Sequence, residues 1–183
     1  TKVMEDRFGE LRSLLQHPPS AEVFKRICAL YPEGEAPEDE LTYLRDHLAR
    51  WDDAITRSAP GAWWGPNQDD VPSLLTLCNG LDFNGLALGP EDAEALARSP
   101  HLEHLTSLDQ SDNGIGDAGA EALAQSPHLK NFTEFNLRGN HIGDVGAEAL
   151  AQSPHLKNLT ELNLYHNAIG DAGAEVLAQS PHL

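Results

Sequence analysis

Four histidines recur at a fixed interval in the second half of the sequence, and they are the first candidates for chemistry. These residues are His101, His128, His155 and His182, which are equally spaced and each preceded by Ser-Pro. A metal site would need ligands from several of these positions, without the nearby cysteine or carboxylate ligands of known sites. Each histidine also belongs to a copied segment that ends a predicted helix, where a donor can meet the last carbonyl groups. We therefore interpret the histidines as part of a copied helix end and predict no metal site.

The other residues of catalytic type form no recognisable motif. Asp69 and Asp70 stand beside Pro72, where we expect a solvated turn. Cys28 and Cys78 lack metal-like spacing, which is typical of buried small apolar side chains. The sequence contains no Gly-rich phosphate loop, H-E-x-x-H, G-x-S-x-G or C-x-x-C, and the glycines of "GDAG" recur with the repeat as turn residues. We predict no catalytic residue, no cofactor and no enzyme activity.

Composition and charge narrow the class of partner. The chain has 183 residues, is 40% hydrophobic and carries a formal charge of −17, from 12 basic and 29 acidic residues. This charge repels nucleic acid and anionic lipid surfaces. Apolar runs fall short of the ~20 residues that span a bilayer, and the first residues lack the apolar core of a secretory signal. We expect no nucleic acid or membrane partner and a cytoplasmic location, with a secreted or injected effector as the alternative.

A repeat with the same period as the histidines organises the chain from about residue 77. In "LTELNLYHN" the leucines alternate as in a strand, and "GDAGAEVLAQ" has the pattern of a short helix. Asp117, Asp144 and Asp171 precede these helices, where we expect each carboxylate to accept from the free amides of the first helical turn. The following Ser-Pro ends the helix. One strand and one helix therefore make one unit.

An asparagine column follows the predicted strands, at Asn84, Asn113, Asn140 and Asn167. The spacings are 29, 27 and 27, which predicts two extra residues in the first unit, near "LALGPED". A single unit cannot bury its leucines, so the units must stack with strands about 4.8 Å apart and helices outside. Because helices are wider than strands, we expect the stack to curve with the sheet on the concave side.

The pattern L-x-x-L-x-L-x-x-N followed by I-G-D-x-G-A resembles leucine-rich repeats of the ribonuclease-inhibitor-like class. It is visible as "LTSLDQSDN", "FTEFNLRGN" and "LTELNLYHN", while the first unit, "LCNGLDFNG", departs from it at Asn79. The resemblance implies an α/β solenoid with a concave parallel sheet, convex helices and asparagines that satisfy backbone groups after each strand. Such nearly identical repeats look more like those of a bacterial repeat protein than of an animal receptor.

Residues 4–57 lack the repeat and are predicted to form three helices. In the third, Leu41, Leu44, Leu48, Trp51 and Ile55 lie on one face. We predict a helical N-terminal capping domain at 1–58, a linker at 59–75 and about four leucine-rich repeats at 76–183. The chain stops at Leu183, where the next strand should begin. We therefore expect a truncated array, or a last repeat covered by a partner or by self-association.

The positions that vary between copies indicate a binding surface. Residues 116–131 and 143–158 match at 15 of 16 positions, so variation concentrates in and around the strands. Side chains between the core leucines should face the concave side. The candidate partner-binding residues are Ser107, Asp109, Ser111, Glu134, Asn136, Arg138, Glu161, Asn163, Tyr165 and His166. Arg138 and Tyr165 are the expected anchors, because arginine and aromatic side chains dominate interface energetics.

The leading functional hypothesis is a module that binds another protein on its concave face. One alternative is a regulatory or effector protein, either host-targeting or similar to the Ran GTPase-activating proteins, whose leucine-rich repeats have a similar period. Another is the substrate-recognition part of a larger enzyme. Random drift after duplication, wherever packing allows it, would also explain the variable positions.

Overall fold

The computed structural model describes residues 2–50, 58–60 and 76–183. The chain divides into two compact units, Thr1–Leu81 and Asp82–Leu183. The predicted linker lies outside the described residues except at positions 59 and 60, which belong to the short strand β1 (Ser58–Pro60). Asp69, Asp70, Trp51 and Ile55 also lie outside the described residues.

The first unit contains the three helices that its sequence predicts. They are α1 (Lys2–Leu14), α2 (Ala21–Ala29) and α3 (Glu38–Leu48). Ser20 caps α2 by accepting a hydrogen bond from the amide of Val23 at 3.2 Å. The apolar stripes of the helices are buried together, and their core includes Leu11, Leu14, Val23, Phe24, Ile27, Leu41, Leu44 and Leu48.

A buried polar cluster joins the three segments of this unit. Glu40, only 3% exposed, accepts a hydrogen bond from the Tyr31 hydroxyl at 2.6 Å and forms an ion pair with Arg7 at 3.0 Å. Burial and, to a smaller extent, the hydrogen bond to Glu40 raise the pKa of Tyr31 far above its usual value. Burial also raises the pKa of the Cys28 thiol to about 12, so this thiol is inert at neutral pH.

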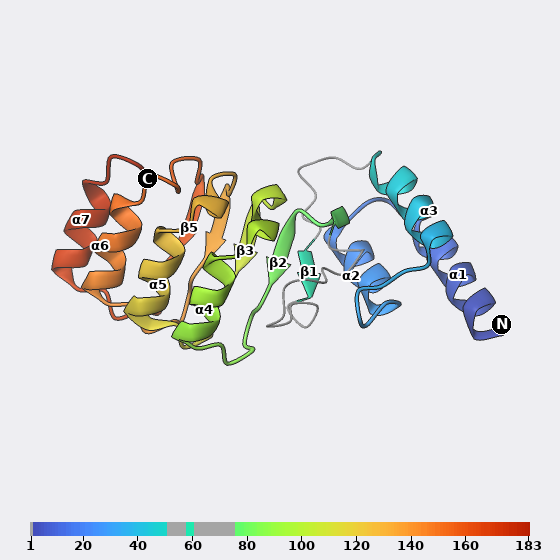
Figure 1. Ribbon diagram of the computed structural model, residues 1–183, viewed down its shortest axis with the longest axis horizontal. Helices are drawn as coiled ribbons and strands as arrows, with labels where there is room; N and C mark the ends of the chain where they lie inside the picture. Colours follow the sequence, from blue (N-terminus) through green and yellow to red (C-terminus); the bar gives the residue numbers. More distant parts are fainter. Residues whose placement is uncertain (1, 51–57, 61–75) are drawn as a thin grey trace. The chain divides into compact units, whose positions relative to one another are not determined.

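The repeat region alternates strands with helices, as Figure 1 shows. Its strands are β2 (Gly80–Asp82), β3 (Ser107–Asp109), β4 (Glu134–Asn136) and β5 (Glu161–Asn163). Its α-helices are α4 (Pro90–Ala97), α5 (Gly116–Ala124), α6 (Asp144–Gln152) and α7 (Asp171–Ala178). Two short 3₁₀ helices, η3 (Pro100–His104) and η4 (Pro127–Leu129), follow α4 and α5.

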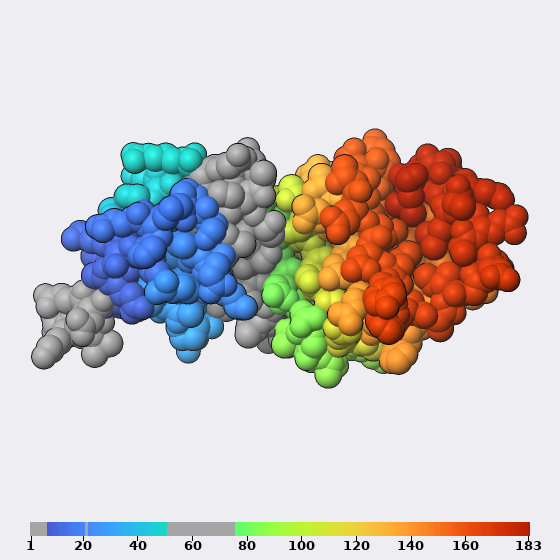
Figure 2. Space-filling model, turned by 180° about the vertical axis from the view of Figure 1, so that it is seen from behind, coloured from blue at the N-terminus to red at the C-terminus, as the bar shows by residue number. Residues whose placement is uncertain are grey.

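Within the second unit, strands β3, β4 and β5 lie in chain order within one sheet. Strands β3, β4 and β5 are parallel and pair with a register shift of one repeat, so that Leu108 lies beside Phe135 and Phe135 beside Leu162. Helices α4–α7 cover one face of the sheet in Figure 1, and Figure 2 shows successive repeats side by side from behind. The predicted α/β solenoid with a helical region before it is confirmed.

The asparagine column is confirmed for three of its four members. Asn140 donates to the carbonyl groups of Gln110 and Leu137, at 2.8 and 3.1 Å, and accepts from the amide of Ile115. Asn113 and Asn167 make the equivalent contacts. These side chains replace the backbone partners that the chain loses where it leaves the strand.

Asn84 does not belong to this column, and the first unit is not longer than the others. The amide of Gly85 donates to the carbonyl of Ser111, as the amide of Asp112 does to Arg138, so Gly85 and Asp112 are equivalent positions of successive repeats. Asn84 therefore corresponds to Ser111, and Leu86 occupies the position of Asn113. The prediction of two extra residues was wrong because it aligned the letters "DFN" with "SDN" without the sheet register.

Two of the three aspartates, Asp117 and Asp144, act across repeats, which corrects their predicted role. Asp117 accepts from the amides of Gly143 and Gly146 at 2.7 and 2.9 Å, and these amides begin the helix of the next repeat. Asp144 does the same for Gly170 and Gly173. A Cβ on Gly146 would lie 2.7 Å from the Asp117 carboxylate, so the second glycine of "GDVG" allows this close approach. The carboxylate thus couples neighbouring units instead of capping its own helix.

The Ser-Pro-His-Leu segment also joins neighbouring repeats. Ser126 has extended backbone angles, as predicted for the residue before proline, and its hydroxyl donates to the carbonyl of Ala97 at 2.5 Å. Ser153 and Ser180 repeat this contact with Ala124 and Ala151.

His128 pairs with a carboxylate of the preceding repeat instead of meeting helix carbonyl groups. Its Nδ1 lies 2.9 Å from Glu103 Oε1. The hydrogen bond with His128 and, to a smaller extent, the charge of Lys130 lower the pKa of the Glu103 carboxyl group. Among the residues with described positions, no three potential ligands are close enough to hold a metal ion.

Candidate protein-binding face

The side of the sheet away from the helices carries the candidate site, which we call the open face. Its side chains alternate along each strand with buried ones such as Leu108 and Phe135, as the period of a strand requires. The open face consists of Asp82, Asn84, Ser107, Asp109, Ser111, Asp112, Glu134, Asn136, Arg138, Glu161, Asn163, Tyr165 and His166. It includes all ten predicted residues and three more, Asp82, Asn84 and Asp112.

The predicted residues differ in how far they are accessible. Glu134, Glu161, Tyr165 and His166 are exposed, and the Tyr165 side chain stands out because 66% of its surface is accessible. Ser107, Asp109, Asn136, Arg138 and Asn163 are half-buried. Ser111 is only 3% exposed, which corrects the expectation that it is open to a partner.

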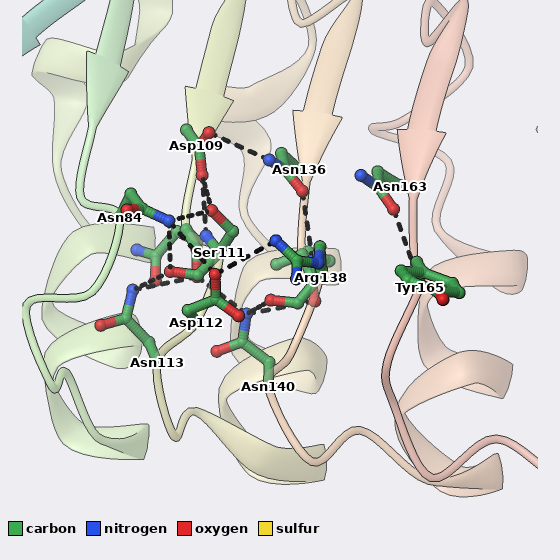
Figure 3. Close-up of polar contacts among 12 residues, drawn as sticks. Asn84, Asp109, Ser111, Asp112, Asn113, Asn136, Arg138, Asn140, Asn163 and Tyr165 are labelled. Carbon is green, nitrogen blue, oxygen red and sulfur yellow. Dashed lines mark hydrogen bonds and ion pairs between the residues drawn. The ribbon is translucent and has the colours of Figure 1, made fainter.

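Ser111 is buried because a polar network closes over it (Figure 3). Asp109 accepts from both the amide and the hydroxyl of Ser111, at 2.8 and 2.5 Å, and from the side-chain amide of Asn136 at 2.9 Å. Asn84, in the preceding repeat, donates to the Ser111 hydroxyl at 2.6 Å. The network thus spans three repeats and fixes the side chains on β3 and β4 before any partner arrives.

Arg138 belongs to the edge of the same network. Its guanidinium lies 3.4 Å from the Asp112 carboxylate, and each side chain is a little under half exposed. Exposed ion pairs of this kind contribute little to stability, but they hold the guanidinium over the preceding repeat. Arg138 is therefore a partly exposed cation with an internal partner, and its predicted role as an anchor stays a prediction.

The turn after each strand has a left-handed residue at the same position in every repeat. This position is occupied by Gly85, Asp112, Gly139 and His166, with φ between 54° and 67°. At Gly139 a Cβ would lie 2.5 Å from Asp112 Oδ1, so a side chain there would collide with the network. At His166 the turn places the imidazole ring 4.1 Å from the Tyr165 ring, in an edge-on contact.

The β5 end of the open face lacks such a network. Asn163 accepts from the amide of Tyr165 at 3.0 Å, which orders the backbone beneath the ring (Figure 3). The Glu134 and Glu161 side chains have no hydrogen bond or ion pair within the described residues. The polar groups around Asp109, Ser111 and Arg138 are therefore paired with one another, whereas Glu134, on β4, and Glu161, on β5, have side chains that are free to bind a partner.

Comparison with known proteins places the repeats in a family. The family model for the Leucine Rich repeat matches residues 101–124, 128–151 and 155–178. Residues 101–178 are leucine-rich repeats. Each match begins at a histidine of the Ser-Pro-His-Leu segment and extends through the strand into the following α-helix. No curated protein matches the chain.

Leucine-rich repeats are in general modules for protein interaction, and in this chain the open face of the repeats carries the variable side chains. Sequence reasoning missed Asp82 and Asn84, because the assignment of Asn84 to the asparagine column hid the strand position of both. It also missed the network around Asp109, whose members lie one repeat apart in the sequence. None of the helices in the described ranges has the length and apolar character needed to cross a bilayer.

Proposed function

We propose that this protein binds another protein through the open face of its leucine-rich repeats. The observation that carries the proposal is the large exposed surface of Tyr165 at the end of a strand, where its backbone amide donates to Asn163 and its ring contacts His166. A tyrosine side chain has only two rotatable side-chain bonds, so it loses little freedom when it enters a partner's pocket, and most of its buried area contributes to affinity.

The contrast between the two sides of the repeats supports the proposal. On the helical side, neighbouring units are nearly identical in sequence, whereas the open face varies more between units, most clearly in the row Ser111, Arg138 and Tyr165. A surface that recognises one partner needs a specific set of side chains on a rigid support. The backbone contacts of Asn113, Asn140 and Asn167 provide that support.

We further propose that the repeats belong to the ribonuclease-inhibitor-like class and that the protein is bacterial. The first proposal is supported by the length of the repeat and by the single strand and single α-helix in each unit. The second is supported by the near identity of consecutive repeats.

Affinity capture from the lysate of the source organism tests the binding face. Wild type is compared with a variant carrying Arg138→Ala, Glu161→Ala and Tyr165→Ala, which removes a cation, an anion and an aromatic group from the open face. We expect the captured partner to be lost, because truncation of a central aromatic anchor alone costs about 2 kcal/mol or more.

A matched control removes the same kinds of group elsewhere. Lys157→Ala, Glu148→Ala and Val145→Ala truncate a cation, an anion and an exposed apolar side chain outside the open face. This variant should capture the same partner as wild type. Recovery of the partner by the open-face variant would show that binding uses another surface.

A further inference from the structure

The charges on the open face are mostly of one sign. The open face carries one permanent cation, Arg138, and five carboxylates, which are Asp82, Asp109, Asp112, Glu134 and Glu161. Three of the five have internal donors: Asp82 accepts from the Asn84 amide, Asp109 from Ser111 and Asn136, and Asp112 from Arg138. Only Glu134 and Glu161 are left without a partner among the described residues.

These two glutamates lie side by side. They are register partners in the parallel pairing of β4 and β5, and both are exposed. Neighbouring parallel strands are about 4.8 Å apart, so the two negative side chains repel each other. A cation placed between them would remove the repulsion and would pair with both.

Tyr165, which follows strand β5, offers a second site for a cation. From Glu161 to Tyr165 the chain continues to pair with the neighbouring repeat, because the Tyr165 carbonyl still accepts a hydrogen bond from the amide of Gly139. Glu161, Asn163 and Tyr165 share one side of this extended stretch. At ~3.3 Å per residue, about 13 Å separates the glutamate position from the tyrosine position. The face of an exposed tyrosine ring attracts lysine and arginine side chains.

We propose that the open face binds an extended, basic protein segment with two cationic side chains four residues apart. One cation pairs with Glu134 and Glu161, and the other stacks on Tyr165. A spacing of four residues matches because an extended peptide rises ~3.3 Å per residue, like the strand beneath it. This inference rests on the proposed function and names the chemistry of the partner.

Synthetic peptides test the proposal with the 183-residue chain. The probe is a capped peptide, Gly-Arg-Gly-Gly-Gly-Arg-Gly, titrated in a low-salt NMR experiment that detects weak binding. A peptide with its two arginines adjacent has the same charge and composition, and a third has glutamates in place of arginines. We expect the probe to bind at least about fivefold more tightly than the adjacent-arginine peptide, because only the probe reaches both sites. We expect no binding of the acidic peptide.

Matched variants locate the contact. Glu134→Gln with Glu161→Gln should weaken the probe about tenfold. Glu148→Gln with Glu175→Gln removes the same charge from exposed positions on α6 and α7 and should change the affinity less than twofold. Tyr165→Ala should weaken the probe about fivefold, whereas Tyr165→Phe keeps the ring face and should bind like wild type. Circular dichroism verifies that each variant is folded.

Three results would overturn the proposal: no binding of the probe, equal binding of the two arginine peptides, or equal losses in the two glutamine variants. Equal losses in Tyr165→Ala and Tyr165→Phe would overturn the stacking contact. The proposed function fails separately, when the open-face variant still captures the partner from lysate. If that partner is lost and the probe does not bind, protein binding stands and the basic segment does not.

Discussion

Gln110 is the residue that fits its surroundings least. It is fully buried at the position that Leu137 occupies in the next repeat, one of the core leucines of the repeat pattern. Neither polar atom of its side chain has a hydrogen-bond partner within the described residues. A buried amide without partners costs free energy, because it gives up hydrogen bonds to water and gains none.

Gln110→Leu should therefore stabilise the repeats by about 1–2 kcal/mol. Urea denaturation followed by circular dichroism should show a higher midpoint for the variant. Leu137→Gln, the converse change one repeat later, serves as the control and should lower the midpoint. An unchanged or lower midpoint for Gln110→Leu would contradict the assignment of this side chain as an unsatisfied group.

At the scale of the elements, each repeat is completed by its neighbour. Asp117 caps α6 and Asp144 caps α7. The hydroxyl groups of Ser126, Ser153 and Ser180 each donate to a carbonyl near the end of the α-helix in the preceding repeat. These side chains satisfy the backbone groups that helix ends leave unpaired. The stability of a repeat is thus partly a property of the contact between repeats.

Asp117→Ala should destabilise the repeats by about 1 kcal/mol, because two amides at the start of α6 lose their acceptor. Asp171→Ala is the matched control. Asp171 has the same place in the repeat, but its exposed side chain accepts no hydrogen bond from the described residues. Thermal unfolding should distinguish the two variants. Equal losses would show that the carboxylate acts through its own helix, as the sequence interpretation supposed.

At the scale of the whole molecule, the net charge of −17 acts against the compact state. The described residues contain five ion pairs, and all but the pair of Arg7 with Glu40 have a carboxylate side chain at least 44% exposed. Exposed pairs contribute little, whereas the repulsion among many carboxylates extends over a Debye length.

Raising sodium chloride from 20 to 300 mM should therefore stabilise the protein by about 1 kcal/mol, or about 2–4 °C in Tm. Differential scanning calorimetry measures the shift. Sucrose at the same osmolality controls for effects unrelated to charge. A Tm that falls with salt would mean that the ion pairs outweigh the repulsion.

The sequence was sufficient for the architecture and for most of the open face. The constant repeat period, the alternating leucines and the Ala-rich helices can be read directly along the chain, so they predicted strand, helix and stacking correctly. The same alternation indicated which side chains leave the core, because successive residues of a strand point to opposite sides. Glu134, Glu161 and Tyr165 are exposed for this reason.

Tertiary structure alone decided which atoms meet. The acceptor for the α6 amides comes from the preceding repeat, Ser111 is buried beneath Asn84 and Asp109, and Arg138 is paired with Asp112. Each of these outcomes depends at least partly on the lateral register between repeats, in contacts that join residues 25 to 30 positions apart. A local sequence pattern shows where each repeat forms its strand and its helix. The hydrogen bonds of the polar side chains in a repeat depend on the neighbouring repeat that packs against it.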